Sequence, residues 1–398
     1  MGAEKPLDGV RVLELGQFIA GPFAAKFFAE FGAEVIKIEA PGRGDPLRKW
    51  RMMHGDTSLW WYVQARAKKS VTADLRTAEG QEIARRLAVR ADILIENFRP
   101  GTLERWNLGY ERLSAANPGL VMLRLSGFGQ SGPYRDAPGF GAVGESMGGL
   151  RYVTGFPDRP PVRLNLSIGD SLAALHGVIG ALMALRRREV RGGRGQVVDV
   201  ALYEAVFNMM ESALPEYDRY GVVRNRTGTN LTGIVPSNTY LSRDGRHIVI
   251  AANADSIFKR LMNAMGRSDL AEDPELAGNE GRSKRAAELD AAIGAWAAGL
   301  DARDLTRRLD EAGVPNGPIY SIADIAADPQ YAAREMIRSV TLPDGSTLKV
   351  PGVVPRLCDT PGDIGWPGPA LGSHTDEVLG SLGYAPAEIA ALRARGVV

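Results

Sequence analysis

The sequence predicts an α/β protein with a Rossmann-like large domain and a smaller α+β domain. Along the first 220 residues, strand-like and helix-like stretches alternate, which is typical of a parallel sheet covered by helices. After residue 220 the pattern changes to a polar stretch, a hairpin signal and several helices. We therefore expect a large domain over 1–220, a small domain over 221–329, and a segment, 330–398, that returns to the large domain.

The first elements form a βαβ unit. Residues 9–15 alternate apolar and polar side chains as a strand does, residues 22–31 have helical spacing, and residues 34–39 indicate a second strand. The turn after the first strand runs from Gly16 to Gly21 and lacks the G-x-G-x-x-G fingerprint. The unit therefore predicts a Rossmann-like sheet and gives little support to a nicotinamide cofactor.

The alternation continues along the chain, with two glycine-rich runs that suit loops where a ligand approaches the backbone. These runs are 126–133 and 139–149. Further strands are expected at 70–75, 92–98, 120–126 and 196–202, and further helices at 79–89, 103–108, 203–211, 255–265, 289–298 and 302–312. Hairpin turns are expected at 244–245 and 341–347, and a helical tail at 375–395.

The composition is that of a soluble globular protein. Hydrophobic residues make up 44% and charged residues 24%, and the formal net charge of +1 favours neither nucleic acid nor an anionic membrane as a partner. The single cysteine, Cys358, excludes an internal disulfide, and we expect a buried or neutral thiol in a reducing compartment. Because no run approaches the roughly 20 apolar residues of a membrane helix and no signal core is present, we expect a cytoplasmic protein without membrane contact.

Two familiar kinds of catalytic site are poorly supported. The four histidines are scattered, and no pair has the spacing of a metal site, so we expect no metal. Gly144-Glu-Ser-Met-Gly148 matches the letters of the G-x-S-x-G serine-hydrolase elbow. That stretch follows a glycine-rich loop and not a strong strand, so the sequence does not favour a serine hydrolase.

The candidate reactive group is Asp170. Residues 171–185 are apolar nearly all round, which predicts a buried helix, and Arg186, Arg187 and Arg188 suit its C-terminal end. Asp170 is expected just before the first turn, at the N-cap, where the helix dipole keeps a carboxylate ionised. Its position alone leaves two readings open, a helix cap and an anionic nucleophile.

Arginines follow several of the expected strands. They are Arg43, Arg48, Arg76, Arg99 and Arg105. Because such turns gather at one edge of a doubly wound sheet, these cations could face a common crevice and bind a phosphate-bearing, extended ligand. The alternative is that each is a solvated surface arginine.

A series of short motifs resembles the class III CoA-transferases, the CaiB/BaiF or formyl-CoA transferase family. The motifs lie at 7–15, 20–22, 32–39, 44–45, 96–101, 127–133, 193–196, 314–318 and 371–377. The resemblance implies a CoA-binding large domain, a small domain joined by long linkers, and an interlocked homodimer of two ring-like chains. It also implies that the partners are small molecules, an acyl-CoA and a carboxylic acid.

The resemblance also assigns roles to residues. The catalytic aspartate falls on Asp170. Positions that contact CoA carry over to Ile19, Ala20, Leu75, Arg76, Asn97, Phe98, Arg99, Arg105, Gly139 and Phe140. Gln17, Arg48 and Glu145 are candidates for contacts with the substrate acids. The implied mechanism passes through an aspartyl-acyl anhydride and an aspartyl-CoA thioester, for which no general base or metal is needed because both nucleophiles are anions.

The substrate pattern departs from formyl-CoA transferase. Gln17 stands where that enzyme has a histidine, and Ile19 where it has a glutamine, so the pattern is closer to transferases that use succinyl-CoA and a dicarboxylate. A second carboxylate would need a cation, and Arg48, Arg66, Arg224 or Arg226 could supply it.

Two alternative functions remain open. One is an α-methylacyl-CoA racemase, although no histidine lies between His54 and His176 to serve as its base. The other is a catalytically silent CoA-binding protein.

Overall fold

The computed structural model describes residues 4–398, and the chain divides into two compact units. Unit 1 comprises the described residues up to Leu150, then Leu164–Glu211 and Gln330–Val398. Unit 2 comprises Arg151–Arg163 and Ser212–Pro329. The last segment thus returns to the first unit, whereas 151–163 and 212–220, which we expected in the large domain, belong to unit 2.

A six-stranded parallel sheet forms the centre of unit 1, as the sequence predicts. Its strands are β1 (Arg11–Glu14), β2 (Glu34–Glu39), β5 (Lys68–Thr72), β6 (Ile93–Glu96), β7 (Val121–Ser126) and β8 (Val197–Ala201), in the spatial order β5-β2-β1-β6-β7-β8. Counted along the chain this is the Rossmann order, whose topological switch point lies between β1 and β6. Ligands of such sheets bind outside the carboxyl ends of the strands at that point.

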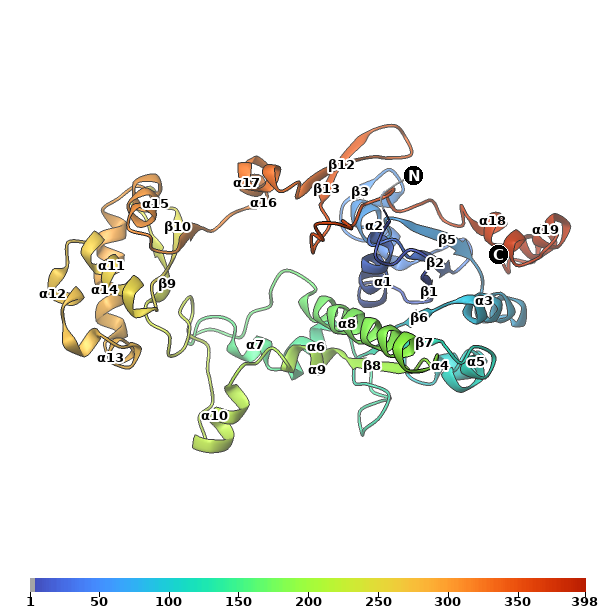
Figure 1. Cartoon of the computed structure of the whole chain (residues 1–398), viewed down its shortest axis with the longest axis horizontal. Helices are drawn as coiled ribbons and strands as arrows, with labels where there is room; N and C mark the ends of the chain where they lie inside the picture. The colour runs from blue at the N-terminus through green and yellow to red at the C-terminus, as the bar shows by residue number, and fades with distance from the viewer. Residues whose placement is uncertain (1–3) are drawn as a thin grey trace. The chain divides into compact units, whose positions relative to one another are not determined.

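Helices cover both faces of this sheet (Figure 1). One face carries α1 (Ala20–Glu30), α8 (Ile168–Arg191) and α9 (Leu202–Phe207), which share a core with the side chains of β6 and β7. The other face carries α3 (Ala78–Arg90), α5 (Tyr110–Ala116), α18 (Thr375–Ser381) and α19 (Pro386–Ala394). Strands buried on both sides explain why β6 and β7 consist of almost continuous apolar residues.

The remaining elements of unit 1 surround this sandwich. They are η1 (Pro46–Lys49), β3 (Met53–His54), β4 (Thr57–Ser58), α2 (Leu59–Gln64), α4 (Thr102–Arg105), α6 (Gly141–Met147), β12 (Ile337–Thr341) and β13 (Thr347–Pro351). The β12–β13 hairpin packs on α2 in a separate small core around Trp61, which is fully buried. Two short helices, α7 (Leu150–Val153) and α17 (Pro329–Ala333), lie at boundaries between the units.

Unit 2 is an α+β unit around a three-stranded antiparallel sheet. The sheet order is β11 (Asn316–Pro318), β10 (His247–Ala251) and β9 (Ser237–Leu241). Its helices are α10 (Ala213–Tyr220), α11 (Asp255–Ala264), α12 (Ser268–Ala271), η2 (Pro274–Leu276), α13 (Asn279–Lys284), α14 (Ala286–Ala298), α15 (Ala302–Glu311) and α16 (Ile322–Ala327). The predicted turn at Asp244 joins β9 to β10, and its carboxylate accepts hydrogen bonds from Ser242 Oγ at 2.6 Å and Ala302 N at 2.9 Å.

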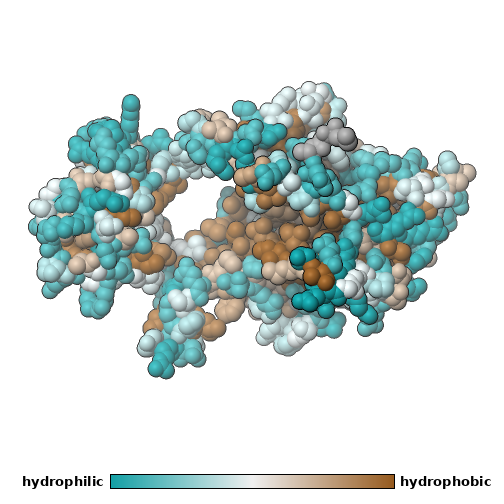
Figure 2. Space-filling view, in the orientation of Figure 1, coloured by the Kyte–Doolittle hydropathy of each residue, from teal (hydrophilic) through white to brown (hydrophobic). Residues whose placement is uncertain are grey.

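The helix predicted at 171–185 is longer and less buried than expected. It spans Ile168–Arg191, and Ile179 and Met183 on it are 52% and 67% exposed. Figure 2 shows apolar side chains gathered over this part of unit 1. Among the described residues, α8 is the one helix long and apolar enough to cross a membrane by length and composition, but its contacts with α1, β7, β8 and α9 mark it as a core helix of the sandwich.

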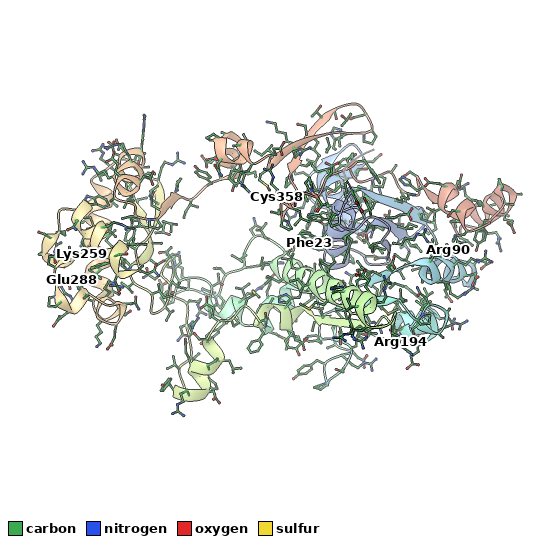
Figure 3. All side chains as sticks on the ribbon, in the orientation of Figure 1. Phe23, Arg90, Arg194, Lys259, Glu288 and Cys358 are labelled. Carbon is green, nitrogen blue, oxygen red and sulfur yellow. The ribbon has the colours of Figure 1, made fainter. Side chains whose placement is uncertain are left out.

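Cys358 also differs from its expected setting. It lies on the segment after β13 (Figure 3) and is exposed, so of the two expected settings, a buried or a neutral thiol, the buried one is wrong.

Candidate active site

Asp170 lies inside the first turn of α8 and not at its N-cap. The helix begins at Ile168, with Ser167 at the N-cap position, so Asp170 is the third helical residue. The expected capping position is therefore wrong by three residues, although the carboxylate still lies where the positive end of the helix dipole favours an anion. Since α8 connects β7 to the parallel strand β8, its N-terminus lies at the carboxyl edge of the sheet.

Glycines make room for the Asp170 carboxylate. A β-carbon built on Gly141 would lie 2.0 Å from Asp170 Oδ2, so no side chain fits at position 141 while the aspartate keeps this orientation. A β-carbon on Gly169 would lie 3.0 Å from the carbonyl oxygen of Gly141. Both glycines let the start of α6 approach the start of α8, which brings the predicted CoA-contacting segment around Gly139 to the aspartate.

Two other predicted residues lie on the same segment. Glu145 is 1% exposed on α6, and its Cγ would be 3.2 Å from a β-carbon on Gly169. Phe140 is 67% exposed, and its ring lies edge-on to that of Phe18 with 6.2 Å between centroids. The structure thus brings Gly139, Phe140 and Glu145 together with Asp170.

Asn97 links the ends of β1 and β6 at the topological switch point. Its Oδ1 accepts a hydrogen bond from Gln17 N and its Nδ2 donates to Gln17 O, each at 2.7 Å. Ile19 and Ala20 come after Phe18 and are buried at the start of α1. The predicted contacts Gln17, Ile19, Ala20 and Asn97 are therefore neighbours at this edge.

Exposed arginines lie beside this edge. Arg76 binds the Asp74 carboxylate through Nε at 2.9 Å and Nη2 at 2.7 Å, and this pairing lowers the pKa of Asp74. Arg99 donates to Asp136 O at 2.6 Å, and Arg105 to Thr102 Oγ1 at 3.0 Å. All three guanidinium groups remain on the surface, where they suit the phosphates of an extended ligand.

The remaining predicted contacts at these turns are apolar. Leu75 is buried beside Arg76, in the core under α3. Phe98 packs its ring against Trp106 with a centroid distance of 5.1 Å. The side chains of Leu75 and Phe98 therefore pack beneath the turns. Contacts of these two residues with a ligand would come from their backbone atoms.

Arg48, predicted as a substrate contact, is committed elsewhere. It is 6% exposed, and it donates to Glu39 through Nε at 2.7 Å and Nη2 at 2.8 Å, and to Pro369 O through Nη1 at 3.0 Å. Its guanidinium also stacks on Trp61, with 3.7 Å between Arg48 Cζ and the centroid of the ring. Burial alone would raise the pKa of Glu39, but Arg48 holds it below its usual value. Arg48 therefore closes a buried ion pair and does not face a substrate.

Arg66, another of the four proposed cations, is also buried. It pairs with Glu30 and donates to Pro351 O at 2.6 Å, and both charged residues are 1% exposed. Two of the four arginines expected to bind a second carboxylate are therefore structural.

The loop 126–133 uses part of its backbone internally. Gly129 N donates to Ser126 Oγ at 3.0 Å, and Gln130 N donates to Asp199 Oδ2 at 2.9 Å. These two N–H groups are therefore not available to a ligand that approaches the backbone of this loop, for example to stabilise an oxyanion.

A buried charge network under the turn after β1 was not predicted from the sequence. Lys37 Nζ lies 2.8 Å from Glu14 Oε1 and 2.9 Å from Asp45 Oδ2. The available signal was a lysine within the apolar strand 34–39, because a lysine is almost never fully buried unless it is paired. Over residues 4–398, no group of three or more His, Cys, Asp or Glu side chains is placed to hold a metal ion.

Similarity to known proteins extends over nearly the whole chain. The sequence profile described as CoA-transferase family III matches residues 7–375. The chain is 53% identical over 396 residues to the succinyl-CoA–D-citramalate CoA-transferase of Chloroflexus aurantiacus, covering 99% of this chain and 98% of that protein. It is 43% identical over 398 residues to the alpha subunit of a succinyl-CoA–L-malate CoA-transferase of the same species, covering 99% and 92%.

A solved structure shares the fold. The crystal structure of a CAIB/BAIF family protein from Brucella suis superposes with a TM-score of 0.82 at 34% identity, covering 95% of this chain and 100% of that chain. The chain therefore belongs to CoA-transferase family III and is a CoA-transferase.

Proposed function

We propose that this enzyme moves CoA from succinyl-CoA to a small dicarboxylic acid, with Asp170 carrying the CoA group between them. The observation that carries the proposal is the Asp170 carboxylate, which lies in the first turn of α8 against Gly141 at the carboxyl edge of the sheet. The names of the two relatives support the choice of donor and point to a four- or five-carbon dicarboxylate such as malate or citramalate as the acceptor.

The reaction proceeds in two symmetric halves. An oxygen of the Asp170 carboxylate attacks the thioester carbonyl of succinyl-CoA and the C–S bond breaks. The products of this step are a mixed anhydride between Asp170 and succinate and the free CoA thiolate. The thiolate then attacks the aspartyl carbonyl and releases succinate, which leaves an aspartyl-CoA thioester. The acceptor carboxylate attacks that thioester, CoA leaves again, and the thiolate attacks the acceptor carbonyl, which regenerates the Asp170 carboxylate. No proton is transferred in any step.

The intermediates hydrolyse easily, so the site has to exclude water. The segment that carries Phe140, together with the loop 126–133, is placed to do so because it adjoins the aspartate. The backbones of these two segments approach closely, since a β-carbon built on Gly127 would lie 2.8 Å from the Cα of Gly139. The two segments together are therefore the proposed cover of the reacting carboxylate.

We also propose a homodimer in the cytoplasm. The exposed apolar side chains of α8 support this assembly, because a surface stripe of this kind is typical of a protein interface. They are Leu175, Ile179, Leu182 and Met183. The malate transferases among the relatives have separate alpha and beta subunits, so a second, different subunit is the alternative partner.

Incubation with succinyl-CoA and a panel of acids tests the function. We expect new acyl-CoA esters with citramalate, malate or related dicarboxylates, and little product with formate or oxalate. Asp170→Asn, which keeps the shape of the side chain, should lower turnover by about 10⁴-fold while CoA still binds. Hydroxylamine added during turnover should mark Asp170 in the wild type, as detected by mass spectrometry. Full activity in Asp170→Asn, or an unmarked Asp170 during active turnover, would contradict the proposal.

The same incubation separates the two alternatives. Exchange of solvent deuterium into the α-carbon of a branched acyl-CoA without any transfer would indicate a racemase. CoA binding without any product would indicate a silent protein.

A further inference from the structure

The turn between β1 and α1 is held by side chains from three other parts of the chain: Lys37 in β2, Asp45 just before η1 and Asn97 just after β6. Lys37 Nζ, from β2, donates to the carbonyl oxygen of Gly16 at 2.7 Å. Asp45 Oδ1 accepts a hydrogen bond from Phe18 N at 3.0 Å. The side chain of Asn97 hydrogen-bonds to both the N–H and the carbonyl oxygen of Gln17, which lies between Gly16 and Phe18. Each polar backbone group from Gly16 O to Phe18 N therefore has a side-chain partner.

Lys37 and Asp45 form one buried unit. Their side chains are each 1% exposed, and Lys37 Nζ lies 2.9 Å from Asp45 Oδ2. Burial alone would lower the pKa of Lys37, but the carboxylates of Asp45 and Glu14 raise it above its usual value, so the lysine stays charged. A change at either residue therefore reaches both ends of the turn.

The turn needs such support because its backbone is strained. Phe18 has a φ of 63°, a left-handed backbone conformation that residues other than glycine rarely adopt. Its ring contacts Trp50 at a centroid distance of 5.2 Å and Phe140 at 6.2 Å. A residue in this region persists where the surrounding structure fixes it, and such sites often serve a function.

The hydrogen bonds also distinguish this turn from the dinucleotide-binding fingerprint. In that fingerprint, glycines leave backbone N–H groups free for a pyrophosphate. Here the N–H groups of Gln17 and Phe18 are already used by Asn97 and Asp45. The turn can therefore serve as a rigid wall for the ligand, but these two N–H groups cannot bind its phosphates.

We propose that Lys37 and Asp45 are positioning residues that preform the turn 16–18 for the acyl-CoA. The proposal rests on the proposed function for the identity of the ligand. Because the turn is fixed before CoA arrives, its rigidity lowers the entropy cost of binding. The pair acts on CoA affinity and not on the chemistry at Asp170.

Asp45→Asn tests the proposal with almost no change of shape. It removes the negative charge that faces Lys37 and puts an amide nitrogen, which is a donor, beside the ammonium group. We expect the Kd for CoA, measured by calorimetry, to rise about tenfold, because the buried Lys37 ammonium loses the charge of one of its carboxylate partners. The rate of hydroxylamine trapping of Asp170 at saturating succinyl-CoA should change less than twofold.

The matched control is Glu30→Gln. Glu30 pairs with Arg66 at the other end of α1 and is equally buried, at 1% exposure. This variant should lower Tm as Asp45→Asn does, but leave the Kd for CoA unchanged. An unchanged Kd in Asp45→Asn, or an equal rise in both variants, would overturn the proposal.

Amide hydrogen exchange of the wild type gives a second test that needs no variant. A peptide covering the turn should exchange slowly without CoA and change little when CoA is added. Rapid exchange that slows on CoA binding would show that the ligand orders the turn and would also overturn the proposal. Both readouts use CoA binding, so they remain decisive even if the enzyme fails to transfer CoA from succinyl-CoA.

Discussion

The carboxylate of Asp170 occupies the space that a side chain at Gly141 would need. The β-carbon position of Gly141 lies 2.0 Å from Asp170 Oδ2 and 2.8 Å from Asp170 Cγ. Neither distance is possible between atoms that are not bonded to each other. The orientation of the proposed nucleophile therefore depends on the absence of a side chain at Gly141. The glycine and the aspartate are 29 positions apart in sequence, and α6 and α8 bring them together.

Gly141→Ala should therefore impair catalysis without unfolding the protein. The new methyl group forces the Asp170 carboxylate to rotate, and a misplacement of about 1 Å at a reacting group costs on the order of 10²-fold in rate. We expect kcat to fall by that amount, with the Kd for CoA nearly unchanged. Gly294→Ala is the control, because a β-carbon there meets nothing closer than 3.8 Å. Wild-type kcat in Gly141→Ala would show that Asp170 reacts from another orientation.

Arg48→Met should destabilise the enzyme and leave acceptor binding intact. The change leaves the Glu39 carboxylate buried without its cation, which costs about 3 kcal/mol or more. We expect a lower midpoint in urea unfolding and an unchanged KM for the acceptor acid in the folded fraction. Arg51→Met, three residues further on, is the control, since Arg51 is exposed and stacks on Trp60 at 4.4 Å. A raised acceptor KM confined to Arg48→Met would restore its predicted role in substrate binding.

The sequence predicted elements well where apolar patterns alone decide them. The strand predicted at 34–39 is β2 with the same bounds, and the helix predicted at 79–89 differs from α3 by one residue at each end. The strand predicted at 70–75 is shifted and begins at Lys68, because charged residues do not signal a buried strand. Lys68 is nevertheless 1% exposed and pairs with Glu14, 54 positions away in the sequence.

The prediction of the candidate active site was limited in the same way, by contacts between residues that are distant in the sequence. The start of α8 was misplaced because Gly169 has a low helix propensity. Its presence inside the helix is explained by the close approach of Gly141, a tertiary contact that the sequence does not display. The exposure of α8 was also missed, because an apolar composition does not show which face of a helix is buried within the chain. The motifs predict Asp170 as the reactive residue, and packing determines how its side chain is held.

Stability should fall as the pH rises from 5 to 8, in part because of Glu96. Burial raises the pKa of Glu96 to about 7, even though Arg124 Nε lies 2.7 Å from its carboxylate. A carboxyl group with a raised folded-state pKa contributes stability below its unfolded pKa, and this contribution is lost as the pH rises through about 7. The free energy of unfolding should fall by about 3 kcal/mol through this loss.

The Glu96→Gln variant isolates this contribution. We expect urea unfolding at pH 5 and pH 8 to show a smaller pH dependence in the variant than in the wild type. Comparing the two proteins at each pH removes the effect of His374, whose pKa is lowered by burial and whose contribution has the opposite sign. Equal pH dependence in both proteins would show that Arg124 keeps Glu96 ionised throughout this range.

Charged residues on the exposed face of α8 should separate the proposed dimer. Ile179 and Met183 lie one helical turn apart and are 52% and 67% exposed. Replacing both with Asp places two carboxylates in an apolar interface, where each uncompensated charge costs several kcal/mol. We expect light scattering to give the mass of a monomer for the double variant and of a dimer for the wild type. Val89→Asp, at a partly exposed apolar position on α3 and the opposite face of the sheet, is the control and should remain a dimer. A double variant that stays dimeric would place the interface elsewhere, and a wild type that is monomeric alone would direct the search to a second, different subunit.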